Sequence, residues 1–134
     1  MRASLILLVV IPVALASFWA GWKVGAGHPA ESRVAGRVSV VVLNALENRI
    51  ILSENVDIWT GQTVFEVTSR VAAVEYKSYP MVGKYITSIQ GLAQTENAWW
   101  LYYVNGQLAG IACDRYGLMD GDNVLWKYTN EMPF

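Results

Sequence analysis

The sequence predicts an α+β domain in which one helix packs on a mixed sheet, preceded by an N-terminal transmembrane helix. Short segments rich in β-branched and aromatic residues recur over residues 38–128, with turn residues between them. Within that region, apolar residues recur at helical spacing at residues 64–73. Ahead of it, residues 3–22 are continuously uncharged. These three observations predict a membrane segment followed by one small domain.

Residues 3–22 would span about 30 Å as a helix, which is the thickness of a bilayer core. We therefore expect residues 1–23 to form a transmembrane signal-anchor that contacts membrane lipid through residues 3–22. A cleaved signal peptide is the alternative, because an Ala-Leu-Ala sequence ends at Ala16 and cleavage there would give a secreted protein. The apolar run continues to Trp19 and Trp22, which suit a membrane interface and favour the uncleaved anchor.

A flexible linker is expected after the anchor. Residues 24–36 contain three glycines and a proline and show no hydrophobic periodicity. A coil of this length extends about 20 Å on average, so the domain, residues 37–134, would stay close to the bilayer. Because a single N-terminal apolar segment usually exports the polar domain that follows it, we expect a single-pass protein of the cell membrane with this domain outside the cytoplasm.

The domain is expected to open with a β-hairpin. Four of the six residues at 38–43 (VSVVVL) are β-branched valines, as expected of a central strand buried on both faces. A polar turn follows at residues 44–49, and residues 50–52 and 56–59 supply a second extended region.

The predicted helix occupies residues 64–73, where Thr63 and Glu66 form a capping-box pair at its start. Further strands are expected at residues 74–76, 84–89, 98–104, 107–112 and 124–128, with a polar loop at 90–97 and an excursion at 113–119. A hairpin, a helix and further strands in this order form the β-grasp arrangement, an α+β layer pair.

The segment 98–106 (AWWLYYVNG) joins an aromatic strand to an Asn105-Gly106 turn, which is typical of a tight hairpin. On a strand, alternate side chains face opposite ways, so one set should pack under the helix and the other should meet the open face. The two sets are Trp99, Leu101 and Tyr103, and Trp100, Tyr102 and Val104. The open set would contact a ligand or a partner protein, or be covered by residues 113–119.

Composition excludes several functional classes. Residues 24–134 hold eight Lys or Arg against eleven Asp or Glu, a net charge of about −3, so nucleic acid is not expected as a partner. The single cysteine, Cys113, excludes an intramolecular disulfide and a Cys-rich metal site, and is expected to be a small buried residue. With only one histidine, His28, in the linker, no His-based metal cluster or catalytic triad is expected.

The carboxylates near the C-terminus are interpreted as turn residues. Asp120 and Asp122 lie two apart around Gly121, where such side chains usually accept hydrogen bonds from the turn's own backbone. Together with Asp114 they do not have the spacing of a calcium loop, so no metal site is expected. Since no nucleophile or acid and base pair with an orienting group is evident, we do not expect an enzyme.

Four motifs occur in order along the domain. They are residues 61–65 (GQTVF), 83–89 (GKYITSI), 99–106 (WWLYYVNG) and 118–128 (LMDGDNVLWKY). Over residues 38–128 the chain thereby resembles the small domains related to the C-terminal β-domain of transcobalamin and intrinsic factor, which also occur in exported bacterial and archaeal proteins of unknown function.

The resemblance implies a corrinoid such as cobalamin as the ligand. In the animal carriers this domain clamps cobalamin against a larger helical barrel. The residues it implies for ligand binding here are Trp100, which matches the Trp of the aromatic strand, and its neighbours Tyr102, Ala109, Gly110 and Ile111. This chain departs from the carriers in three ways, because it has no helical barrel, no disulfides, and additional aromatic residues at Trp99 and Tyr103.

Two functions therefore stay open. The first is a membrane-tethered, extracytoplasmic module that binds a small ligand, with a corrinoid as the leading candidate. The second is a non-enzymatic module of the cell envelope whose aromatic face docks another protein.

Overall fold

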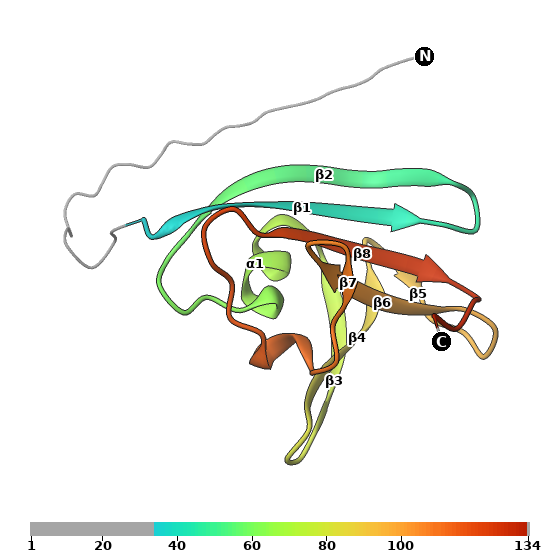
Figure 1. The fold of residues 1–134 in the computed structure, drawn as a ribbon. Helices are drawn as coiled ribbons and strands as arrows, with labels where there is room; N and C mark the ends of the chain where they lie inside the picture. The colour runs from blue at the N-terminus through green and yellow to red at the C-terminus, as the bar shows by residue number, and fades with distance from the viewer. Residues whose placement is uncertain (1–33, 134) are drawn as a thin grey trace. The chain divides into compact units, whose positions relative to one another are not determined.

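The computed structural model describes residues 34–133, which belong to one compact unit, Val34–Phe134 (Figure 1). The expected membrane segment, residues 1–23, and most of the expected linker lie outside the described residues. Within residues 34–133, no helix has both the length and the apolar character needed to cross a bilayer.

A five-stranded mixed sheet forms one layer of the domain. Its strand order is β2-β1-β8-β6-β7, with β1 and β8 parallel and the other neighbours antiparallel. The strands are β1 (Gly36–Asn44), β2 (Arg49–Ile58), β6 (Trp99–Val104), β7 (Gln107–Leu108) and β8 (Asn123–Thr129). The first and last long strands are therefore neighbours at the centre of the sheet, although they lie at opposite ends of the domain's sequence.

The second layer contains the helix and a small antiparallel sheet. The helix is α1 (Val64–Val71), and the three-stranded sheet has the order β3-β4-β5, with β3 at Val74–Tyr79, β4 at Gly83–Ile89 and β5 at Leu92–Ala93. The expected α+β class, with one helix on a mixed sheet, is confirmed. The separate second sheet was not expected.

The start of the helix is fixed as the sequence predicts. The Glu66 backbone N–H donates to Thr63 Oγ1 over 3.2 Å, and the Thr63 backbone N–H donates to Glu66 Oε1 over 3.0 Å. This reciprocal pair satisfies two N–H groups that have no partner within the helix. The helix ends at Val71, two residues before the predicted end.

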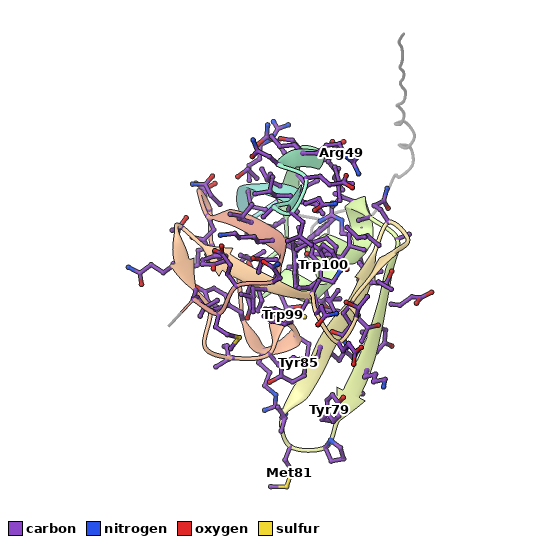
Figure 2. All side chains as sticks on the ribbon, turned by 90° about the vertical axis from the view of Figure 1, so that its right-hand side faces the viewer. Arg49, Tyr79, Met81, Tyr85, Trp99 and Trp100 are labelled. Atoms are coloured by element: carbon purple, nitrogen blue, oxygen red, sulfur yellow. The ribbon has the colours of Figure 1, made fainter. Side chains whose placement is uncertain are left out.

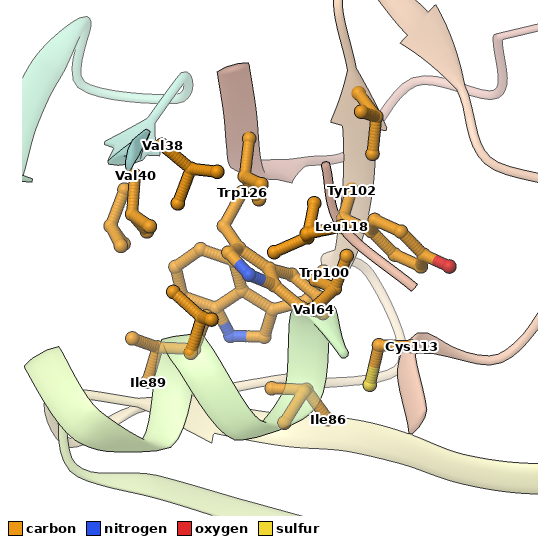
Figure 3. Packing of buried hydrophobic residues seen from close by; sticks show 14 of the residues in the cluster. Val38, Val40, Val64, Ile86, Ile89, Trp100, Tyr102, Cys113, Leu118 and Trp126 are labelled. Atoms are coloured by element: carbon orange, nitrogen blue, oxygen red, sulfur yellow. The ribbon is translucent and has the colours of Figure 1, made fainter. Parts of the chain in front are cut away.

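The core lies between the two layers (Figure 3). Trp126 of β8 is its central aromatic residue, 2% exposed, and its Nε1–H donates to Thr68 Oγ1 of α1 over 2.8 Å. Ile86 and Ile89 of β4 enter the same core from the second sheet. The α1 helix and β4 thus cover the same face of the large sheet.

The other face of the large sheet is covered by none of the elements that the structure describes. Along β1, buried and half-exposed residues alternate, so the expectation that this strand is buried on both faces is wrong. The strand is central, but the helix and the small sheet both pack on one side of it. β-branched residues on the second face, such as Val41, therefore stay partly exposed.

Three expected boundaries differ. The first strand after the helix extends to Tyr79, and the expected loop at residues 90–97 contains β5. The return strand expected at residues 107–112 ends at Leu108. It ends early because the chain then crosses toward the core, where Ala112 is 3% exposed and Cys113 is 2% exposed.

Candidate ligand-binding site

A cavity of about 440 Å³ lies between β4, β6 and the segment that follows β7. Its wall is mostly apolar. It is lined by Lys84, Tyr85, Ile86, Trp100, Leu101, Tyr102, Leu108, Ala109, Gly110, Ile111, Ala112, Cys113 and Trp126. All five residues that the sequence nominates for ligand binding are among them, so the structure brings the whole set together at one cavity.

Trp100 and Tyr102 form the inner wall of this cavity and belong to the core at the same time. Each is 8% exposed, and both lie on the face of β6 that packs against the second layer (Figure 3). Trp100 Nε1–H donates to the Leu92 carbonyl over 2.9 Å, and the Tyr102 hydroxyl donates to the Ile111 carbonyl over 2.6 Å. Their polar atoms are thus already paired, and they present ring surface to the cavity.

The segment from Ala109 to Ile111 forms the mouth. Ile111 is 51% exposed, and the space around Gly110 is open, since a Cβ built there would have no neighbour within 4 Å. Within residues 34–133, the backbone N–H groups of Gly110 and Ile111 donate no hydrogen bond. The mouth therefore combines an apolar side chain with backbone donors that a ligand can use.

Two ionisable side chains of the cavity wall, Tyr102 and Cys113, are held in their neutral forms by burial. Burial and then the neighbouring Asp114 carboxylate raise the pKa of the Cys113 thiol to about 12, so the thiol stays protonated at neutral pH. Burial is also the main cause that raises the pKa of Tyr102. Lys84 Nζ lies 4.5 Å from the Phe65 ring centroid, a cation–π distance. The wall offers apolar contact rather than a nucleophile.

The second set of aromatic-strand residues lies on the uncovered face of the large sheet. Trp99, Leu101 and Tyr103 are half-buried there. Residues 113–119 do not cover them, because Leu118 belongs to the core and the ring of Tyr116 lies 6.2 Å from that of Tyr102. The alternative in which this excursion covers the open set is therefore wrong.

The expectations for the acidic turn are confirmed in part. Asp122 Oδ2 accepts from the Met119 backbone N–H over 2.9 Å, which is the expected turn contact. Asp120 Oδ1 instead accepts from the Arg37 backbone N–H of β1 over 2.8 Å, so it links the turn to the sheet. Across the described part of the chain, no three His, Cys, Asp or Glu side chains gather as metal ligands would.

The sequence does not predict that β4 contributes to the wall of this cavity. Lys84, Tyr85 and Ile86 reach the cavity only because β4 packs across β6. The alternating pattern of residues 84–89 identifies the strand but carries no signal for which strand it faces. Cys113, by contrast, was expected as a buried residue, and its burial is confirmed.

Comparison with known proteins gives a family and solved structures of similar fold. A family model described as "Domain of unknown function (DUF4430)" matches residues 61–130. None of the curated proteins matches significantly. A solved structure from Ruminococcus gnavus ATCC 29149, whose name attributes metal binding to it, aligns with a TM-score of 0.57 and 17% identity over 72% of this chain and 99% of its own.

Haptocorrin in complex with Cbi aligns with a TM-score of 0.58 and 19% identity over 75% of this chain. The chain spans 27% of haptocorrin, so the likeness concerns one domain-sized part of that protein. At these identities the two structures show the fold alone, whereas the family match extends over more than half of the 134 residues. The chain therefore belongs to the DUF4430 family, and it shares its fold with a part of haptocorrin.

Proposed function

We propose that this protein is a membrane-tethered, extracytoplasmic module that binds a small ligand at the cavity between β4 and β6, with part of a corrinoid such as cobalamin as the leading candidate for the group held there. The observation that carries the proposal is the cavity itself. Its volume of about 440 Å³ falls in the range of small-molecule sites, and its lining contains Trp100, Tyr102 and the segment from Ala109 to Ile111.

The chemistry of the wall suits a flat molecule with polar edges. Trp100 and Tyr102 supply ring surface, and the backbone N–H groups of Gly110 and Ile111, which have no acceptor within residues 34–133, are available as donors at the mouth. A corrin ring has an apolar face and amide-bearing edges, and it would use both kinds of contact. Haptocorrin, which shares the fold, holds Cbi, and this supports the corrinoid as the first ligand to test.

Replacing Gly110 with tryptophan is expected to weaken ligand binding by at least about tenfold, because the new ring would occupy the mouth of the cavity. The fold should tolerate the change, since a Cβ at this position meets no atom within 4 Å. The measurement is isothermal titration of the full chain in detergent with cobalamin, for the wild type and for Gly110→Trp.

Gly117→Trp is the matched control. A Cβ at Gly117 also has open space around it, and this glycine does not line the cavity. Its affinity for cobalamin should equal that of the wild type. If the wild type shows no heat of binding at the highest soluble cobalamin concentration, cobalamin is not its ligand. If all three proteins bind cobalamin with equal affinity, this cavity is not the binding site.

The uncovered sheet face supports a second candidate function, the docking of an envelope protein. Half-buried apolar residues of three strands meet there, namely Val41, Leu43, Trp99, Leu101, Tyr103 and Leu125. Trp99 Nε1 is buried and has no hydrogen-bond partner among the described residues. A contiguous apolar surface of this kind usually marks an interaction site, so this face has the character of an interface.

A photoreactive phenylalanine analogue in place of Tyr103 is expected to give one discrete crosslinked adduct in native membranes if this face docks a protein. Adding Leu101→Arg should reduce the adduct by about tenfold, because a charge at the centre of an apolar contact is costly. The same analogue at Leu46, in the β1–β2 turn, should give none. Only diffuse or absent labelling at position 103 would argue against this second function.

A further inference from the structure

The hairpin formed by β3 and β4 ends in an exposed apolar tip. Figure 2 shows it projecting from the rest of the domain, with Met81 at its end and Tyr79 and Tyr85 behind it. Of the twelve large hydrophobic side chains exposed in the described residues, five lie within residues 76–85. They are Tyr76, Tyr79, Met81, Val82 and Tyr85, and Met81 is 93% exposed.

The turn holds Met81 outward at a conformational cost. The Val82 backbone N–H donates to the Tyr79 carbonyl over 3.1 Å, which closes a four-residue turn with Pro80 and Met81 at its centre. Met81 has a φ of 68°, in the left-handed region where glycine or asparagine is usual. The most exposed of the large hydrophobic side chains in the described residues therefore occupies a strained backbone position, which indicates a function for that side chain.

The hairpin is attached firmly behind this tip. The rings of Tyr79 and Tyr85 meet edge to face at 5.7 Å across the two strands. The Lys84 backbone N–H donates to Asp114 Oδ1 over 2.9 Å, which connects β4 to the segment beside the cavity. The tip is thus presented on a paired and anchored hairpin rather than on a free loop.

The part of the hairpin beyond Glu75 is positively charged, whereas the domain as a whole is negative. Residues 76–85 (YKSYPMVGKY) contain two lysines and no carboxylate. Residues 34–134 as a whole contain seven Lys or Arg and ten Asp or Glu, a net charge of −3. A positive and apolar projection on an acidic domain complements an anionic lipid surface, which attracts Lys and accepts apolar side chains.

From these features we infer that the β3–β4 tip inserts into the surface of the lipid bilayer that carries the chain's own N-terminal segment. Met81 and Val82 would enter the acyl boundary, and Tyr79 and Tyr85 would lie at the headgroup level, where aromatic rings with a polar end are favoured. This inference rests on the proposed membrane tether.

The length of the chain between anchor and domain supports the bilayer as the occupant. The apolar run ends at Trp22 and the described domain begins at Val34. A coil of eleven residues would reach about 20 Å, which would keep the surface of the domain within reach of the headgroups. The tip is convex, which suits a fluid surface. The cavity lies next to the tip, since Tyr85 lines the cavity and belongs to the tip, and insertion would bring the cavity near the lipid.

The test is a single label at the tip of the full chain. Met81→Cys is coupled to an environment-sensitive fluorophore, and the protein is reconstituted into phosphatidylcholine vesicles with and without phosphatidylglycerol. Cys113 should stay unlabelled, because it is 2% exposed. We expect a blue shift of the emission in vesicles, larger with phosphatidylglycerol, and quenching by a lipid-borne nitroxide.

Arg49→Cys is the matched control. Arg49 is exposed at the end of the domain opposite Met81 in Figure 2, and its label should keep an aqueous emission. Adding Val82→Asp to the Met81→Cys protein should reduce the inserted fraction by about tenfold or more. The change would replace the apolar side chain that enters the acyl boundary of the bilayer by a charged one.

The outcomes distinguish insertion of the β3–β4 tip from membrane tethering by the N-terminal segment. Flotation with the vesicles and an aqueous Met81 label would leave the tether in place and overturn insertion of the tip, in favour of a protein partner. A chain that stays in solution, with an aqueous label, would contradict both proposals. A blue shift that survives Val82→Asp would also overturn the assignment to this tip.

Discussion

Replacing Trp126 with alanine is expected to lower the free energy of unfolding by about 3–5 kcal/mol. Trp126 is 2% exposed, and its ring lies 5.0 Å from that of Tyr102. The substitution would open a cavity between the layers and leave the Thr68 hydroxyl, also buried, without its donor. The measurement is urea unfolding of residues 34–134, followed by far-ultraviolet circular dichroism.

Two further variants identify what causes the loss of stability in Trp126→Ala. Trp126→Phe keeps most of the ring and removes the hydrogen bond to Thr68, so it should cost less than alanine. Trp99→Ala removes a ring from the uncovered face, where the side chain is half-buried, and should cost less than about 2 kcal/mol. Equal losses for Trp99→Ala and Trp126→Ala would contradict the assignment of Trp126, rather than Trp99, to the core.

The order of the elements was accessible from the sequence because its signals are local. Asn105 and Gly106 both have positive φ, 54° and 82°, as a tight hairpin turn requires. The pair Thr63 and Glu66 marks the start of the helix by chemistry confined to four residues. Such features depend on neighbours in sequence, so a single chain reveals them.

The division into two sheets was not accessible in the same way. The strands β4 and β6 have similar apolar alternation, yet one joins the small sheet and the other the large one. Strand partners are chosen by contacts distant in sequence, for example the parallel pairing of Val42 with Trp126. Periodicity indicates that a strand exists but does not identify its partner.

For the candidate binding site, the aromatic strand at residues 98–104 likewise shows what the sequence pattern alone cannot predict. Alternation separates Trp100 and Tyr102 from Trp99 and Tyr103, but each set contains two aromatic residues, so composition does not say which set faces the core. The position of the second layer decides it, and Trp100 with Tyr102 is the buried set. The five nominated residues came from a family resemblance, whereas the β4 wall of the same cavity depends on packing across the two sheets.

Replacing Gly83 with alanine is expected to lower the free energy of unfolding by about 2–5 kcal/mol. Gly83 has a φ of 126°, which side chains rarely adopt, and a Cβ there would lie 2.5 Å from Asp114 Oδ1 and 2.6 Å from the Ala112 Cβ. The clash has to be relieved by moving β4 away from residues 112–114, which would break the hydrogen bond from Lys84 to Asp114. Thermal and urea unfolding of residues 34–134 would measure the loss.

Gly91→Ala is the control that separates the cost of backbone strain from the cost of the close contacts made by the added Cβ. Gly91 also has a positive φ, 80°, but a Cβ there has no neighbour within 4 Å, so the change should cost only about 1–2 kcal/mol. Because Ala112 lines the cavity and Gly83 packs against it, Gly83→Ala should weaken ligand binding as well, while Gly91→Ala should leave it unchanged. Equal effects of the two variants on stability would mean that backbone strain alone explains the glycine at position 83. A larger loss at Gly83, accompanied by weaker binding, would show that the close contact between β4 and residues 112–114 shapes the cavity.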